Sequence, residues 1–259
     1  MKYFWILYKY FLHILRAKNT KGHGVHSPFL YAFTQEVIYE TNPFYIFLSI
    51  EKIRAELWLD NRILNVSDFG TGAKNQVKVS DLAKKSLKNK KWAQLLFRVI
   101  NFSKAKNILE LGTSLGVTTS YIASVGSDMK CVTLEGASEI VNVAKENFKK
   151  LRLTHVEVIE GNIDETLSSA LEKFKTLDVV FFDANHRKEP TLRYFNQCLP
   201  LIHENTIFVF DDIYWSKEMC EAWQKIKENE QITATIDLFH VGIVFFNKSL
   251  PKINYKMNR

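Results

Sequence analysis

Glycine and proline are scarce in this chain of 259 residues, which contains 10 and 5 of them. That scarcity argues against long disordered or low-complexity segments, and we find no internal repeat. Cysteine is rarer still: Cys131, Cys198 and Cys220 are far apart, odd in number and not arranged as a CxxC pair. The cysteines therefore exclude a disulfide framework and a zinc site of the usual spacing. A reducing, cytoplasmic setting fits them best.

Long apolar runs are also absent. The strongest candidate, MKYFWILYKYFLHILRAK at the N-terminus, is too short to span a bilayer. Lys9 and His13 interrupt the apolar region that a signal peptide needs, and no small-residue cleavage site follows. The segment predicts an amphipathic helix that packs on its own domain or on a partner subunit, as in a homodimer. The alternative is attachment to a membrane surface.

The formal net charge of +7 comes largely from a run of lysines between Lys74 and Lys91, opposed only by Asp81. Such runs usually form the solvated face of a helix. An anionic partner such as nucleic acid is the alternative. Neither aromatic residues nor arginines interleave the run, which argues against recognition of bases.

The spacing of apolar residues along the sequence divides the chain into two parts. Residues 1 to 60 and 76 to 102 have helical patterns, and Ser27–Pro28 and Asn42–Pro43 are typical helix starts. From residue 107, five short β-rich runs alternate with helical patterns, and a final pair of runs at about 232–246 is joined by a turn around His240. Strands joined so closely must pair antiparallel.

This alternation predicts an α/β fold, with a Rossmann-like sheet of seven mostly parallel strands and one antiparallel strand near the edge. Helices cover both faces. We expect residues 1–90 to form a helical N-terminal extension or cap, and residues 91–259 to form the catalytic domain.

Two glycine-rich segments compete as the nucleotide loop of that sheet. The first, DFGTG from Asp68 to Gly72, is followed by helical patterns and by no acidic strand end, so we interpret it as a tight turn. The alternative is a loop that lines the site. The second, ELGTSLG, precedes a helix and then a strand that ends in Glu135, nineteen residues after Gly116. An acid at that distance is typical of a residue that binds a ribose.

The second loop does not fit a dinucleotide. Its glycines, Gly112 and Gly116, have GxxxG spacing instead of GxGxxG, and Ser114 and Leu115 occupy part of the space that a pyrophosphate needs. Glu110 would repel a phosphate, but it would attract a ligand that carries ammonium and sulfonium cations. S-adenosylmethionine is such a ligand.

The successive segments NILELGTSLGVTTSYIA, CVTLEGASEIVNVAKENF, IEGNIDETL, LDVVFFDANH and IFVFDDIYW resemble the motifs of class I S-adenosylmethionine-dependent methyltransferases. The resemblance covers roughly residues 91 to 247 and is greatest to the small-molecule O-methyltransferase branch, which includes the catechol and caffeoyl-CoA enzymes. The HGVHSPF segment is similar to extensions of bacterial members. Each motif alone is weak, but their combination in this order is specific.

The resemblance implies roles for the residues at these positions. Glu110, Gly112 and Gly116 would surround the methionine moiety, with Ser114 in the same loop, and Glu135 would bind both ribose hydroxyls. Gly161 and Asn162 would lie at the adenine, with Ile163 against the ring. Asp183 would lie near the methionine amine or a metal.

Three acids at two neighbouring strand ends, Asp183, Asp211 and Asp212, predict a cation site, because strands are only about 4.8 Å apart and unscreened carboxylates repel. All-oxygen ligands favour Mg²⁺, and metal-dependent O-methyltransferases have such a site at this position, often with Asn where Asp212 stands. Alternatively, Asp211 or Asp212 caps the following helix and Asp183 touches only the cofactor.

The sequence does not decide which residue is the general base. His186 occupies the position where the catechol enzymes have a lysine, and a histidine could take the acceptor proton. Alternatively, His186 only orients its loop. His23 and His26 are weaker candidates, because an N-terminal lid would have to bring them to the site.

The sequence thus predicts a methyltransferase acting on a small-molecule hydroxyl, with or without a divalent cation. The alternatives are a nucleic-acid or protein methyltransferase and a non-catalytic S-adenosylmethionine-binding protein. A base-methylating enzyme would have an Asn/Asp-Pro-Pro-aromatic motif where this chain has DANH, so we expect no nucleic-acid partner.

Overall fold

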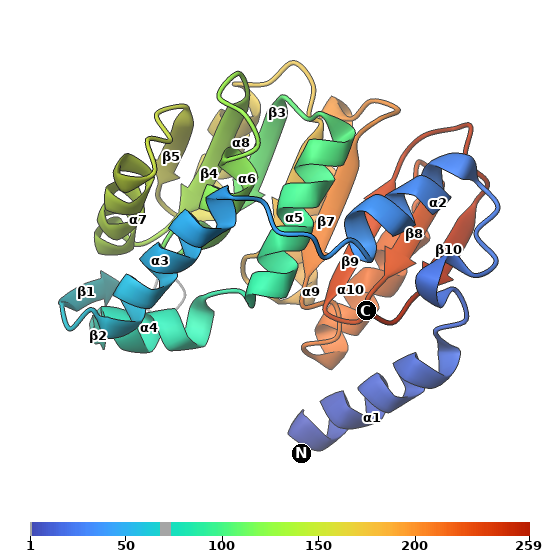
Figure 1. Cartoon of the computed structure of the whole chain (residues 1–259), viewed down its shortest axis with the longest axis horizontal. Helices are drawn as coiled ribbons and strands as arrows, with labels where there is room; N and C mark the ends of the chain where they lie inside the picture. The colour runs from blue at the N-terminus through green and yellow to red at the C-terminus, as the bar shows by residue number, and fades with distance from the viewer. Residues whose placement is uncertain (1, 68–73) are drawn as a thin grey trace. The chain divides into compact units, whose positions relative to one another are not determined.

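The computed structural model describes residues 2–67 and 74–259. The predicted turn at Asp68–Gly72 lies outside these residues. The chain forms an α/β fold with a mostly parallel central sheet of eight strands (Figure 1). It divides into two compact units, Met1–Glu40 with Phe174–Arg259, and Thr41–Lys173.

The first unit contains five strands in the order β10-β8-β9-β7-β6. Its elements, in chain order, are α1 (Lys2–Arg16), η1 (Thr20–Gly22), α2 (Pro28–Phe33), the π-helical turn η2 (Thr34–Ile38), β6 (Val179–Phe182), α9 (Lys188–Cys198), η3 (Leu199–Leu201), β7 (Ile207–Asp211), α10 (Lys217–Lys227), β8 (Ala234–Asp237), β9 (Val241–Phe245) and β10 (Ile253–Lys256). Only β9 runs antiparallel to its neighbours in this unit. The predicted antiparallel strand near the edge is therefore confirmed.

The second unit contains the strand order β3-β4-β5, all parallel, and a separate antiparallel pair, β1-β2. Its elements are α3 (Ile46–Leu59), β1 (Ile63–Ser67), β2 (Lys74–Lys78), α4 (Val79–Ser86), α5 (Lys90–Ser103), β3 (Asn107–Leu111), α6 (Val117–Ala123), β4 (Lys130–Glu135), α7 (Ser138–Lys150), β5 (Val156–Glu160) and α8 (Ile163–Leu171).

Two strand predictions need correction. The sheet has eight strands instead of seven because the short segment β10 adds to the edge beside β8. Residues 76–78, predicted to be helical, belong to β2, which pairs with β1. Both strands depend on a partner distant in sequence, which a local apolar period does not reveal.

Aromatic side chains cover both faces of the sheet in the first unit. On one face, Phe33 at the end of α2 packs against Phe245 of β9, with ring centroids 5.1 Å apart. On the other face, Phe195 of α9 and Trp223 of α10 contact Phe208 and Phe210 of β7. Because side chains alternate along a strand, these helices cover opposite faces of the sheet, and all five residues of β7 are buried.

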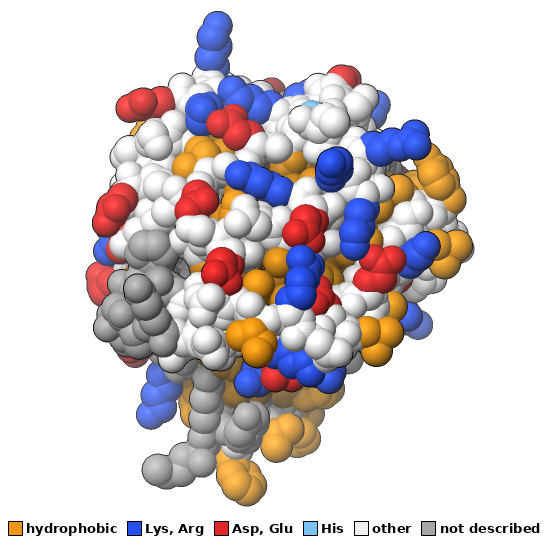
Figure 2. Space-filling view, turned by 90° about the vertical axis from the view of Figure 1, so that its left-hand side faces the viewer, with side chains coloured by type: hydrophobic (Ala, Val, Ile, Leu, Met, Phe, Trp, Pro, Cys, Tyr) orange, Lys and Arg blue, Asp and Glu red, His pale blue; other side chains and the backbone are white. Residues whose placement is uncertain are grey.

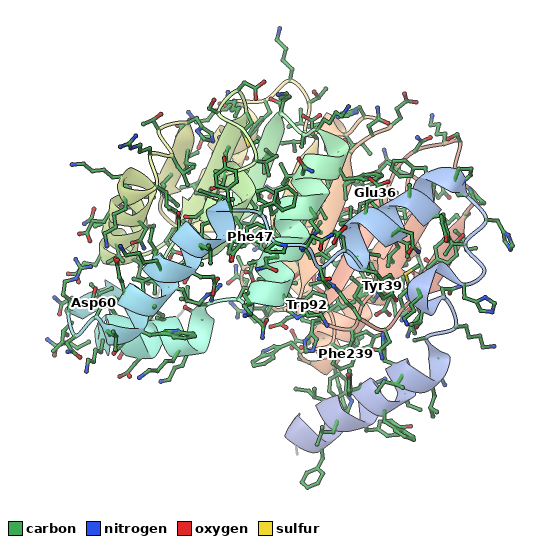
Figure 3. All side chains as sticks on the ribbon, viewed as in Figure 1. Glu36, Tyr39, Phe47, Asp60, Trp92 and Phe239 are labelled. Carbon is green, nitrogen blue, oxygen red and sulfur yellow. The ribbon has the colours of Figure 1, made fainter. Side chains whose placement is uncertain are left out.

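The α1 helix is attached to its unit by a buried polar contact. His13 Nε2 lies 2.9 Å from the Met257 carbonyl oxygen, and its Nδ1 lies 3.3 Å from Asp237 Oδ1 at the end of β8. Tyr10 packs edge-on against Phe239, which Figure 3 places beside α1. The helix therefore lies against the carboxyl end of β8. Among the described helices, none is long and apolar enough to cross a bilayer.

Asp237 should make the stability of this unit depend on pH. Burial alone would raise the pKa of this carboxyl group, but His13, Lys256 and Tyr214 together lower it from 3.8 to about 2. A depressed folded-state pKa stabilises the fold above the unfolded value, and the gain is lost as pH falls towards the folded value. This pKa shift corresponds to about 2 kcal/mol of the free energy of unfolding at neutral pH.

Asp237→Asn should therefore lower the unfolding free energy by about 2 kcal/mol at pH 7, with most of the difference gone near pH 2. Urea unfolding of both proteins at pH 7, 4 and 2.5 measures this dependence. A penalty of the same size at pH 7 and pH 2.5 would contradict the assignment. Glu230→Gln, a change at an exposed acid of the same unit, is the control.

The lysine run lies on α4, α5 and the segments beside them. Lys84, Lys85, Lys90 and Lys91 are exposed, as expected for a solvated helix surface. On the face shown in Figure 2, basic and acidic side chains are interspersed.

Candidate active site

The loop between β3 and α6 bends sharply at two glycines of the second unit. Gly112 has φ of 103° and donates its N–H to the Leu134 carbonyl oxygen at 3.0 Å. Gly116 has φ of 77° at the start of α6, and a Cβ there would lie 2.8 Å from Phe148 Cε1. Both backbone conformations favour glycine. The GxxxG spacing thus places β3, the loop and α7 in close contact.

Gly116→Ala should lower the unfolding free energy by about 2–4 kcal/mol, because it combines a left-handed backbone with overpacking against Phe148. Gly126→Ala is the matched control, since a Cβ there would lie 3.1 Å from an Asp128 carboxylate oxygen and 3.7 Å from Met129 Cε, both at the ends of side chains. Chemical denaturation of the three proteins tests the difference. Equal stability of the two variants would show that the loop relaxes without cost.

Glu110 lies on β3 and is fully buried. Its Oε2 accepts hydrogen bonds from the hydroxyls of Thr119 and Thr133, the latter at 2.7 Å. Its Oε1 accepts none from the described residues. Burial raises the pKa of this carboxyl group to about 7, although the two threonines oppose the shift. A buried acid with an unsatisfied oxygen is costly, and it suits a site that receives a donor or a cation.

Glu135 ends β4 beside the glycine loop. One carboxylate oxygen accepts the Ser114 N–H at 2.8 Å, and the other accepts the Ala137 N–H at 3.1 Å. The Glu135 backbone carbonyl accepts the N–H of Gly161 at 2.9 Å. The structure therefore brings together Glu135, Ser114 and Gly161, three of the residues predicted to bind the cofactor.

Asn162 has a structural role that the sequence interpretation did not assign. Its Oδ1 accepts the Asp164 N–H at 3.1 Å and caps α8. Ile163, which begins that helix, is buried. Capping fixes the start of α8 directly after Gly161, so the loop after β5 is held in a defined conformation.

The first unit contains an acidic cluster at the ends of β6 and β7. Potential ligand atoms of Asp183, His186 and Asp211 all lie within 4.8 Å of one another. His186 Nε2 is 3.6 Å from Asp183 Oδ1, and Asp211 is 6 % exposed. The cluster includes His186, predicted as a base, and does not include Asp212, predicted as a metal ligand. His23 and His26 are exposed and are not part of the cluster.

The backbone that presents this cluster is strained. Asn185, His186 and Asp212 have φ values of 64°, 34° and 51°, in a region that residues other than glycine seldom adopt. Such strain concentrates at functional sites. Asn185 Nδ2 donates to the Tyr194 hydroxyl at 2.6 Å and holds the loop. The sequence interpretation missed Asn185 and Tyr194, whose only signal is their position after a strand-end acid.

Residues 109–213 match the family model described as a methyltransferase domain. This range contains both the residues around the glycine loop and the acidic cluster. This stretch is therefore similar to methyltransferase domains. The predicted resemblance to class I O-methyltransferases is confirmed.

A curated relative of this chain is catechol O-methyltransferase from Niastella koreensis. It is 32 % identical over 126 residues, which cover 48 % of this chain and 55 % of the relative. The chain thus spans about half the length of this relative.

Two solved structures share the fold of this chain. An O-methyltransferase from Bacillus cereus, in complex with SAH, has a TM-score of 0.56 and 18 % identity, covering 82 % of this chain and 95 % of its own. An O-methyltransferase of tomaymycin synthesis from Streptomyces achromogenes, in complex with SAM, has a TM-score of 0.60 and 16 % identity, covering 83 % and 96 %. These similarities confirm the Rossmann-like fold.

Proposed function

We propose that the chain is an S-adenosylmethionine-dependent methyltransferase that acts on a hydroxyl group of a small molecule. The observation that carries the proposal is the pair of carboxylates beside the GxxxG loop: buried Glu110, with one unsatisfied oxygen, and Glu135, fixed by the Ser114 N–H. Both acids favour a cationic ligand over a pyrophosphate. The similarity of 126 residues of this chain to a catechol O-methyltransferase supports a small-molecule acceptor.

The residues of the second unit fit this cofactor. Glu110, Gly112, Ser114 and Gly116 would hold its methionine part, and Glu135 would accept hydrogen bonds from its ribose hydroxyls. Gly161, Asn162 and Ile163 would border its adenine. When bound, the cofactor supplies an electrophilic methyl group on a sulfonium. The chain contributes alignment and exclusion of water, because opposite charges neutralise in the transition state and alignment dominates.

The acidic cluster of the first unit fits a divalent cation. Asp183 and Asp211 supply carboxylate oxygens, Asp212 follows directly in the chain, and such ligands suit Mg²⁺. A cation there would lower the pKa of an acceptor hydroxyl. His186, 3.6 Å from Asp183, is positioned to take the proton and is our candidate for the general base. The resemblance to O-methyltransferases also assigns Asp183 to the cofactor amine.

We further propose that residues 1–90, whose described elements are helical apart from the β1-β2 pair, serve as an extension of a methyltransferase domain at 91–259, and that the protein acts in the cytoplasm. The three cysteines carry no disulfide, which agrees with a reducing compartment.

The extension also suggests how two copies associate. The outward side of α1 carries six large apolar side chains that are 43–80 % exposed: Phe4, Leu7, Tyr8, Phe11, Ile14 and Leu15. At roughly 150–200 Å² per large side chain, they offer about 600 Å² per copy, close to the ~800 Å² per partner of a stable interface. We propose that a second copy of α1 covers this stripe.

Light scattering after size-exclusion chromatography tests the dimer. The wild-type chain should elute as a dimer, and the double variant Leu7→Glu/Phe11→Glu should elute as a monomer, because two buried charges would oppose the contact. Tyr31→Glu, at an exposed aromatic of α2, should stay dimeric. A monomeric wild-type protein would refute the proposal.

A further inference from the structure

A cavity of about 370 Å³ lies within the first unit, between α1, α10, β10 and the segment that contains Tyr214. Basic side chains predominate in its lining. They come from four elements: Lys9, Arg16, Lys188, Lys225 and Lys256. Only two carboxylates, those of Glu221 and Glu228, share the lining with them.

The two carboxylates are already paired. Lys188 Nζ lies 2.8 Å from Glu221 Oε2, and Lys225 Nζ lies 3.2 Å from Glu228 Oε2. Lys256 lies 3.3 Å from buried Asp237, beneath the cavity. Lys9 and Arg16 have no ion pair within the described part of the chain. The cavity therefore keeps two uncompensated positive charges, both from α1.

The position of α1 directs these two charges inward. Lys9 and Arg16 are seven residues apart, which is two helical turns, and so lie on the same side of the helix. His13, 2 % exposed, lies on that side between them. Its contacts with Met257 and Asp237 fix the rotation of α1. Lys9, which is half-buried, and Arg16, which is exposed, thus both line the cavity.

We propose that this cavity binds a small molecule that carries a phosphoryl group. A phosphate dianion matches the two unpaired cations in charge. The planar guanidinium of Arg16 can form paired hydrogen bonds to phosphate oxygens, and Lys9 and Lys256 add point charges. The volume falls within the range of small-molecule sites. The proposal does not depend on methyl transfer, because every residue used here differs from those assigned to the cofactor and the cation.

Calorimetric titration of the full-length protein at low ionic strength tests the site. Inorganic phosphate and glycerol 3-phosphate should bind with one site per chain, and acetate should bind more weakly. Arg16→Gln should weaken phosphate binding about tenfold or more, because it removes charged hydrogen bonds. Arg16→Lys should recover part of the loss. Lys18→Gln removes an equal charge from an exposed position outside the cavity lining, and should leave the affinity unchanged.

Vesicles of phosphatidylglycerol distinguish a lipid headgroup from a free phosphoryl compound, since glycerol 3-phosphate should bind without any lipid present. Circular dichroism checks that each variant is folded. The proposal is overturned if phosphate does not bind, if acetate binds as tightly as phosphate, or if Arg16→Gln and Lys18→Gln have the same effect. Binding to vesicles without binding of free phosphate compounds would also overturn it.

Discussion

Replacing Glu135 with alanine should weaken the binding of S-adenosylmethionine by about 1.5–3 kcal/mol, or roughly tenfold to a hundredfold. The carboxylate accepts the backbone N–H groups of Ser114 and Ala137, and it would also accept the ribose hydroxyls of the cofactor. Its loss removes charged hydrogen bonds and frees the glycine loop. Calorimetry on the purified wild-type and variant proteins measures the change.

Two further variants separate the charge of Glu135 from its shape. Glu135→Gln keeps the size of the side chain, so an intermediate loss is expected if the charge contributes. Glu157→Ala, at an exposed acid on neighbouring β5, should bind as tightly as the wild type. Undiminished affinity in Glu135→Ala would remove this residue from the cofactor site.

Asp211→Asn should lower the rate of methyl transfer about a hundredfold or more. An effect of this size is usual when an enzyme loses the group that helps to remove the proton of the reacting hydroxyl. The carboxylate is buried, and its oxygen lies in the cluster with Asp183 and His186. An amide keeps the shape but loses the charge that would hold a divalent cation. Cofactor affinity should stay nearly the same, because Glu110 and Glu135 belong to another group of residues.

Chelation gives an independent route to the same result. EDTA should abolish transfer by the wild-type protein, and added Mg²⁺ should restore it. Calorimetric titration with Mg²⁺ should give a binding signal for the wild type and for Glu204→Gln, an exposed acid of the same unit, but not for Asp211→Asn. If metal-free protein transfers methyl groups at the full rate, the cation has no part in the reaction. His186→Ala then becomes the decisive variant for the base.

Local patterns were enough to predict the alternating part of the fold. The runs at β3, β4, β5, β6 and β7 are short, apolar and rich in β-branched or aromatic residues, and each is followed by a helical period. The predicted bounds equal the observed ones at β3 and β4 and differ by only one or two residues at β5, β6 and β7. Burial on both faces of a parallel strand makes such runs conspicuous.

The elements that were missed form through distant pairing. The strand β10, INYK, has only four residues and no continuous apolar run, and it becomes a strand because it pairs with β8. The segments β1 and β2 stabilise each other, while the lysines of β2 match a helical surface equally well. A single sequence contains no signal for the partner strand.

In the candidate site, too, some features could be predicted from the sequence and others could not. The acids at strand ends could be predicted, because ligands gather at the carboxyl ends of parallel strands. The capping role of Asn162 and the hydrogen bonds of Thr119 and Thr133 to Glu110 could not. They depend on side-chain directions that only the packed structure defines. The positive φ of His186, which brings it beside Asp183, is equally invisible in the sequence.

Transfer of an isotopically labelled methyl group from S-adenosylmethionine tests the central proposal most directly. The purified protein is incubated with the labelled cofactor and a cell extract, and the small-molecule, RNA and protein fractions are analysed by mass spectrometry. We expect the label on an oxygen of a small molecule, with none transferred by Asp211→Asn. Label in the RNA or protein fraction, or a bound cofactor that transfers no label to any fraction, would contradict the proposed function.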